Sequence, residues 1–174
     1  MTAREGVAVV VLLAIVALVY VGMRAGWKRR ARTTGALVPT LPTAPADPGA
    51  VRLGPVDATY VSTTTAGDWL DRVVAHDLGV RSQASVTVHD AGVSIARTGA
   101  ADVFVPAGSL TDTSTAPGMA GKFVGKDGLV VLTWAPTTTP GAPLLDTGLR
   151  PHHSADGTAL VAAVSALIAT KEKA

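Results

Sequence analysis

The chain has 174 residues, among them 15 Lys and Arg, 13 Asp and Glu, and no Cys. The lack of cysteine excludes a disulfide framework, a thiolate metal site and a cysteine nucleophile. Six of the basic residues lie before residue 33, so the rest of the chain is slightly acidic, and we expect no nucleic-acid partner.

The first predicted element is an apolar, uncharged helix over residues 6–23, followed by a basic cluster. Eighteen residues at 1.5 Å each give about 27 Å, close to the hydrocarbon thickness of about 30 Å. Only Arg4 precedes the helix, whereas Arg24, Lys28, Arg29, Arg30 and Arg32 follow it. By the positive-inside rule, this predicts a single-pass cell-membrane protein with residues 1–5 outside and the C-terminal part cytoplasmic. A cleaved signal peptide fits less well, because the basic cluster follows the apolar run.

The basic segment 24–32 has two interpretations. It serves as a topology signal, and it would also attract anionic lipid headgroups at about 1 kcal/mol per charge. The two roles are compatible, and the topology role is the simpler one.

A proline-rich linker is predicted over residues 33–55. It holds five of the eleven prolines, which exclude helix and sheet interiors. As a semi-rigid spacer at about 3.1 Å per residue, it would reach about 70 Å from the membrane. The PTLPTAP stretch as a ligand of a proline-binding domain is the less favoured alternative.

Residues 56–170 are predicted to form one small, mainly β domain. The expected strands are 58–64, 84–88, 93–95, 103–105, a central strand at 129–134 and a last strand at 143–148. The expected turns are Asp90-Ala91-Gly92, Gly99 and Lys126-Asp127-Gly128. Because these connections are too short for crossover helices, the pattern predicts an antiparallel meander.

Two helices are expected in the same domain. The first covers Asp68 to Leu78, with Asp68 as its N-cap and Gly79 after its end. The second runs from Ser154 or Asp156 to Thr170 with an apolar stripe formed by Leu160, Val161, Val164, Leu167 and Ile168. The second helix should bury this stripe against the open end of a small barrel, with residues 171–174 as a tail.

Several strands followed by one C-terminal helix resemble the pleckstrin-homology-like (PH-like) fold. The segments TYVSTTTAGDWLDRVVAHDLGVR (59–81), DVFVPAGSL (102–110), AGK (120–122), GLVVLTW (128–134) and LDTGLR (145–150) carry a more specific resemblance. They are similar to actinobacterial single-pass membrane proteins with a bacterial PH-like domain, often labelled loosely as export or transporter proteins. The resemblance implies a membrane location and a helix-capped PH-like barrel, and it brings no established catalytic residues.

Lipid-binding PH domains place basic residues between their first two strands, and this chain departs from that pattern. Residues 66–81 contain Arg72 and Arg81 but also Asp68, Asp71 and Asp77. Five charges with a net value of −1 do not form a phosphate clamp, so phosphoinositide recognition is not carried over. In the same segment, Trp69 with Asp68, Asp71 and Arg72 is the candidate contact surface for a partner. Trp134 is expected in the core.

No motif indicates an enzyme, a cofactor or a metal site. Asp68 and Asp71 with His76 fit a capping residue and a solvated helix face better than an acid–base or metal cluster. His152-His153 fits a solvated loop. The segment GMAGKF (118–123) lacks the spacing and the Ser or Thr of a P-loop.

The sequence therefore predicts a non-enzymatic, membrane-anchored adaptor that presents a cytoplasmic PH-like domain to a protein partner. The alternative is an accessory subunit of a membrane transport or export system, since one span cannot form a pore.

Overall fold

The computed structural model describes residues 11–26, 35, 38–123, 125, 128–139 and 141–172. Residues 1–10, the basic residues Lys28, Arg29, Arg30 and Arg32, and the expected turn at Lys126-Asp127 lie outside the described residues. Residues 11–26 are helical, as predicted for this part of the chain, and their large apolar side chains are exposed. Within the described ranges, no helix is both long and apolar enough to cross a membrane.

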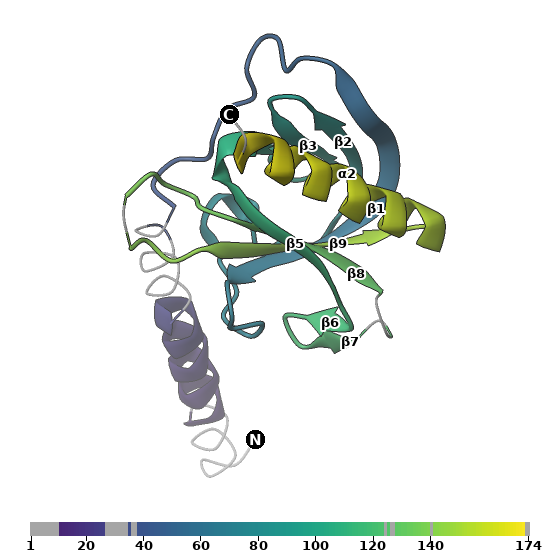
Figure 1. Cartoon of the computed structure of the whole chain (residues 1–174). Coiled ribbons are helices and arrows are strands. Elements are labelled where there is room, and N and C mark those ends of the chain that lie inside the picture. Colours follow the sequence, from purple (N-terminus) through teal and green to yellow (C-terminus); the bar gives the residue numbers. More distant parts are fainter. Residues whose placement is uncertain are drawn as a thin grey trace.

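The domain is a seven-stranded antiparallel bent sheet with a C-terminal helix lying across it (Figure 1). The strand order is β4-β3-β2-β1-β9-β8-β5. The strands are β1 (Val51–Thr65), β2 (Ser82–His89), β3 (Gly92–Arg97), β4 (Val103–Pro106), β5 (Leu110–Ala116), β8 (Leu129–Trp134) and β9 (Leu145–Pro151). A separate hairpin consists of β6 (Gly118–Met119) and β7 (Lys122–Phe123).

The meander prediction is confirmed for β1 to β4, because these strands are neighbours in sequence order. The β2–β3 hairpin turns at Asp90 and Ala91, as the Asp-Ala-Gly signal predicts. Gly92 has a φ of +152°, and a Cβ there would collide with the carbonyl oxygen of Val105, so this position requires glycine. The long strand β1 also pairs with β9, far away in the sequence. This pairing joins the two halves of the sheet.

The second predicted helix is confirmed as α2 (Ser154–Glu172). Leu160, Val164 and Leu167 are buried in the main core, and Val161 and Ile168 pack against it. The Lys171 side chain donates to the carbonyl oxygens of Gly108 and Leu110 at 2.7 and 3.3 Å. These bonds attach the last turn of α2 to the 3-10 turn η2 (Ala107–Ser109) and to the start of β5.

The helix predicted over residues 68–78 is wrong. The chain turns back along β1 instead, with Arg72 bridged to Thr64 and the Val73 amide donating to the carbonyl oxygen of Thr63. These sheet bonds use backbone groups that a helix would need for itself. Only a 3-10 turn, η1 (Ala75–Asp77), remains, and within it His76 has a φ of +53°, outside helical conformation.

The predicted linker boundary at residue 55 is also wrong, because β1 begins at Val51 and the preceding residues pack on the domain. We call residues 38–50 the strap. Val38 has no exposed surface and belongs to the main core. Leu41 packs against that core, and Leu41 to Ala44 share a hollow with β3 and β4. The prolines of residues 33–55 predict a spacer, whereas the apolar side chains of Val38 and Leu41, which directly precede Pro39 and Pro42, pack on the core.

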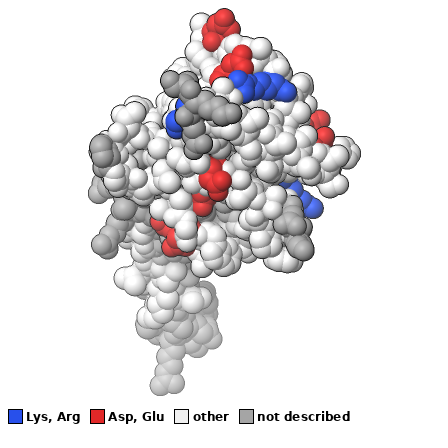
Figure 2. Space-filling model, in the orientation of Figure 1, with Lys and Arg blue, Asp and Glu red and all other residues white. Residues whose placement is uncertain are grey.

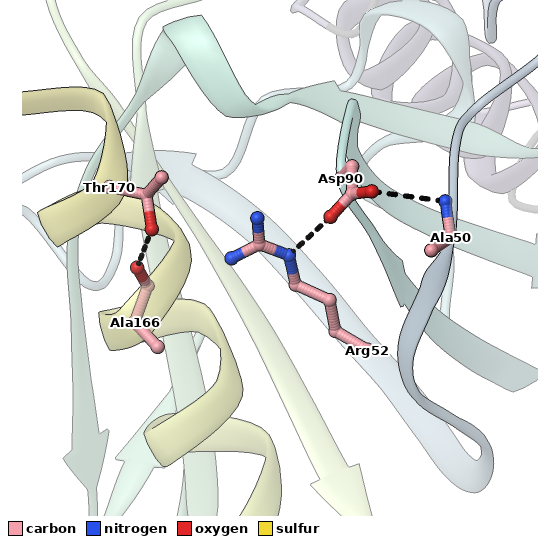
Figure 3. A network of polar contacts seen from close by, with 5 residues as sticks. All are labelled: Ala50, Arg52, Asp90, Ala166 and Thr170. Carbon is pink, nitrogen blue, oxygen red and sulfur yellow. Dashed lines mark hydrogen bonds and ion pairs between the residues drawn. The ribbon is translucent and has the colours of Figure 1, made fainter. Parts of the chain in front are cut away.

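Hydrogen bonds fix the far end of the strap to the β2–β3 turn. The Ala91 amide donates to the carbonyl oxygen of Pro48, and the Asp90 amide donates to that of Ala50. The Asp90 carboxylate accepts from the Ala50 amide at 3.1 Å and from Arg52 Nε at 2.7 Å (Figure 3). The bond from Arg52 lowers the pKa of this carboxyl group below its ordinary value. The strap therefore crosses the domain rather than standing away from it.

Truncating the apolar stripe of α2 should weaken the domain. Leu160→Ala removes a fully buried side chain, so we expect the free energy of unfolding to fall by about 2–5 kcal/mol. The matched control is Leu70→Ala, where the leucine is 57% exposed and a change within about 0.5 kcal/mol is expected. Denaturant unfolding followed by Trp fluorescence measures both. Equal losses for the two variants would contradict the packing of α2.

Candidate functional site

The residues singled out from the sequence lie in the segment that joins β1 to β2, which we call the 66–81 loop. Asp68 Oδ1 accepts hydrogen bonds from the amides of Leu70 and Asp71 at 3.0 and 3.2 Å. Asp71 Oδ2 accepts from Thr65 Oγ1 at 2.8 Å. The two carboxylates therefore close a tight turn at the end of β1. Their role as capping and turn residues follows from these bonds, although the turn is not the helix that was expected.

Trp69 lies at the tip of this turn and is 54% exposed. Its carbonyl oxygen accepts from the Ala120 amide at 2.7 Å, and Arg72 Nη2 donates to the carbonyl oxygen of Ala120 at 3.4 Å. These two bonds dock the turn on the β6–β7 hairpin. The backbone thus holds Trp69 in place while its ring remains accessible.

The β6–β7 hairpin supplies the other half of the site. Ala120 and Gly121, with φ values of +53° and +77°, form its two-residue turn. Met119 packs with Val61, Leu129 and Val131 in a second, smaller core. This anchoring leaves Phe123 80% exposed. The GMAGKF segment is therefore a hairpin, in agreement with the sequence-based rejection of a P-loop.

Trp69, Pro117, Gly118, Gly121 and Phe123 together line a hollow of about 350 Å³, and we call them the Trp69–Phe123 surface. All five are uncharged, and three of the five carry large apolar side chains or rings. Sequence reasoning identified Trp69 and missed Phe123. The available signal was an aromatic residue two positions after the Gly121 turn residue, in a Gly-rich segment.

A larger hollow, of about 590 Å³, lies beside the first turn of α2. Among the described residues that line it, Arg150 is the only permanent cation, and both Arg150 and His153 are exposed. The hollow contains none of the Asp68, Trp69, Asp71 and Arg72 group. The adjacent residues His152 and His153 stay at the surface, as predicted, and the His152 amide donates to the carbonyl oxygen of Asp57 at 3.0 Å.

A buried arginine holds the 66–81 loop to the end of the sheet. Arg97 is 7% exposed, and its guanidinium donates to the carbonyl oxygens of Asp77, Val80 and Ala101 at 3.0, 2.6 and 3.1 Å. Its Nε donates to Ser82 Oγ at 3.1 Å. One side chain thus joins the loop, the start of β2 and the β3–β4 connection.

The Arg97 guanidinium also stacks on a buried tyrosine. Its Cζ lies 3.9 Å from the centre of the Tyr60 ring, a cation–π geometry. The Tyr60 hydroxyl donates to the carbonyl oxygen of Leu78 at 3.1 Å and lies 2.5 Å from Thr63 Oγ1. Thr147 Oγ1 continues the network and accepts from Trp134 Nε1 at 2.9 Å. Trp134 is in the core, as predicted.

The buried position of Arg97 could have been predicted from the sequence, but the predicted strand ended at residue 95. Val93, Ile95 and Arg97 alternate along β3, which places the arginine on the same inward face as the two apolar residues. The carboxylate of Asp102 accepts the Arg97 backbone amide at 2.7 Å. The four acceptors of the side chain are three carbonyl oxygens and one hydroxyl.

Acidic and basic side chains are interspersed over the face drawn in Figure 2, and neither sign gathers into a large patch there. Within the described residues, no group of three or more His, Cys, Asp or Glu side chains is arranged to hold a metal ion. His76, which the sequence placed near Asp68 and Asp71, instead contacts the strap, with its Nε2 2.8 Å from the carbonyl oxygen of Val38.

Comparison with protein-family models matches residues 38–165 to the Bacterial PH domain-like family. The matched region begins at the first residue of the strap and extends into α2. No curated protein matches the chain.

Removing the buried guanidinium should release the 66–81 loop. Arg97→Met leaves three carbonyl oxygens without their donor, at about 1–3 kcal/mol for each buried unpaired group, so we expect a loss of about 3 kcal/mol or more. The control is Arg81→Met, which changes the exposed arginine at the end of the same loop, with an expected change within about 0.5 kcal/mol. Denaturant unfolding measures both variants. A mild effect of Arg97→Met would show that water replaces the guanidinium.

Tyr60 should make the domain sensitive to alkaline pH. Burial raises the pKa of its hydroxyl from 10.0 to about 12. The unfolded chain therefore ionises first as pH rises past 10, and the folded state loses stability until its own hydroxyl ionises. We expect stability to be constant below this window and to fall through it.

The absorbance of tyrosinate provides the direct measurement, because the chain has two tyrosines, Tyr20 and Tyr60. Tyr60 should ionise only above pH 10 in the folded protein, and Tyr60→Phe should remove this late phase together with the alkaline loss of stability that Tyr60 causes. Ionisation of Tyr60 at its ordinary pKa in the folded protein would contradict its burial.

Proposed function

Because the chain belongs to the Bacterial PH domain-like family, we propose that it is a membrane-anchored, non-enzymatic adaptor. In this proposal the apolar N-terminal helix holds the PH-like domain at the cytoplasmic face of the cell membrane, and the domain makes contacts rather than catalysing a reaction. The uncharged sequence of residues 6–23 and the five basic residues after it support the anchoring and the orientation.

The single observation that carries the contact role is the Trp69–Phe123 surface. The domain buries Tyr60 and Trp134 but leaves Trp69 and Phe123 more than half exposed, side by side around one hollow. Clustered exposed apolar residues are typical of a site that contacts a partner or a membrane. A backbone bond from the Ala120 amide to Trp69 and a side-chain bond from Arg72 to the Ala120 carbonyl oxygen hold the two halves of this surface together.

The bonds of the titratable residues support a non-enzymatic role. Asp68 and Asp71 close the turn, His76 contacts the strap, and Asp90 holds Ala50 and Arg52. Each of these side chains has a structural partner.

The anchoring is tested by extraction of native membranes at alkaline pH. The full chain should stay in the membrane pellet, because an integral helix resists this treatment. The variant Leu13→Arg with Val16→Arg places two charges in the apolar helix and should be released to the supernatant. Release of the unchanged chain would refute the anchoring.

The contact role is tested with a photoreactive benzoyl-phenylalanine at position 69 of the full chain, compared with position 51. Val51 is 58% exposed at the opposite end of β1 and is the matched control. Cross-linking of position 69 to a partner protein or to lipid, at a yield that Phe123→Ser reduces, would support the proposal. Equal cross-linking yields from positions 69 and 51 would overturn it. Cross-links found only from position 16, within the N-terminal helix, would favour an accessory subunit of a membrane complex instead.

A further inference from the structure

We propose that the Trp69–Phe123 surface rests in the headgroup region of the bilayer that holds the chain's own N-terminal helix. This inference depends on the membrane anchoring proposed above and assigns the lipid bilayer as the partner of that surface. It follows from where the chain enters the domain, how short the connection is, and which side chains are exposed at the end of the domain that carries the 66–81 loop.

The chain enters the domain at the end that carries the 66–81 loop. Val38 is fully buried in the core, and its carbonyl oxygen contacts His76 of that loop. From there the strap runs past β3 and β4 to the β2–β3 turn, where Pro48 and Ala50 are bonded. The strap thus leads away from the point of entry and does not lengthen the tether.

Residues 27–37 are the only connection between the end of the described N-terminal helix and the buried Val38. Even a fully extended chain spans at most about 3.6 Å per residue, so this connection reaches at most about 40 Å. A free linker through residue 55 would have added the whole strap to this reach. The entry end of the domain is therefore held within about 40 Å of the membrane, and in this proposal the β2–β3 turn, at the other end of the strap, faces away from it.

The Trp69–Phe123 surface belongs to this membrane-facing end. Trp69 follows Thr65, the last residue of β1, and its loop returns along Thr63 and Thr64 before it reaches His76 and the entry point. Val51 begins β1 and pairs with His89 next to the β2–β3 turn. The two exposed apolar positions, 69 and 51, thus lie at opposite ends of the same strand.

The chemistry of the surface fits the interfacial region rather than an anionic headgroup. Trp and Phe rings on a protein surface partition favourably into the boundary between headgroups and acyl chains. Asp68, Asp71 and Arg72 beside Trp69 sum to −1, and Lys122, which precedes Phe123 in the sequence, brings the sum to zero, so no net charge attracts anionic lipids. We therefore expect the contact to form on zwitterionic phosphatidylcholine and to persist at high salt.

The contact can be weak and still be populated. A short tether keeps the domain at a high effective concentration next to the membrane, so binding at the surface becomes an intramolecular event. Two exposed aromatic rings suffice to orient a domain that the helix already anchors. The strap face and the β2–β3 turn then point toward the cytoplasm, where an adaptor would meet a protein.

The test uses the full chain in phosphatidylcholine vesicles with one nitroxide label per variant, which is simple because the chain has no native cysteine. Leu70→Cys and Val51→Cys form a matched pair, since the native side chains are 57% and 58% exposed. Val16→Cys reports the anchoring helix. Collisions with oxygen, which concentrates in lipid, are compared with collisions with a water-soluble nickel complex.

We expect a several-fold higher oxygen-to-nickel collision ratio at position 70 than at position 51, unchanged by high salt. Adding Trp69→Ser and Phe123→Ser to Leu70→Cys should lower the ratio to the level of position 51. Equal ratios at 70 and 51, with position 16 embedded in lipid, would overturn this inference and leave the anchoring intact. A label at 70 shielded from both reagents would assign the surface to a protein or a second copy and would also overturn it. A water-exposed position 16 would refute the anchoring itself.

Discussion

The buried guanidinium of Arg97 is the interaction on which the arrangement of this domain depends. It lies at the end of the β3 inward face, where the next position along the strand would ordinarily be apolar, and it donates to the 66–81 loop, the start of β2 and the β3–β4 connection. A buried cation is costly unless its donors are satisfied, and here backbone carbonyl oxygens and the face of Tyr60 satisfy them. The consequence is a loop of many residues between β1 and β2 that is fixed without being a helix.

That fixed loop determines where the rest of the chain can go. Because Arg97 holds the loop around Asp77 and Val80, His76 is in place to contact Val38, and the core has a defined slot for the valine. The strap then follows from Val38 to Ala50 along the domain. A proline-rich segment that composition alone would assign to a free spacer becomes part of the folded unit, and the family match from residue 38 has the same boundary.

The same loop separates the aromatic residues into two groups. Tyr60 and Trp134 share one buried hydroxyl network through Thr63 and Thr147, in which each polar atom of the two rings has a partner. Trp69 lies in the turn closed by Asp68, and the β6–β7 hairpin places Phe123 at the same hollow. The small core around Met119 fixes the hairpin on the outer face of the sheet. Rigid backbone on both sides therefore presents two rings to the outside, as an interaction module of a PH-like domain requires.

Local patterns in the sequence determined the elements whose stability comes from their own periodicity. The alternation of β2 and β3, the turn at Asp90, the buried strand ending in Trp134 and the apolar stripe of α2 are all read from neighbouring residues, and each agrees with the structure. The apolar N-terminal run and its basic flank are equally local. Tertiary structure decided the rest, because the bonds involved join distant parts of the chain. Backbone groups of residues 72–73 pair with β1 instead of forming a helix, and Val38 is buried only because the loop at His76 is there to receive it. Arg97 is inside because the carbonyl oxygens of Asp77 and Val80, 20 and 17 residues away, converge on it together with that of Ala101. No window of sequence contains these partners together, so neither the strap nor the Trp69–Phe123 surface could be derived before the fold brought them into contact.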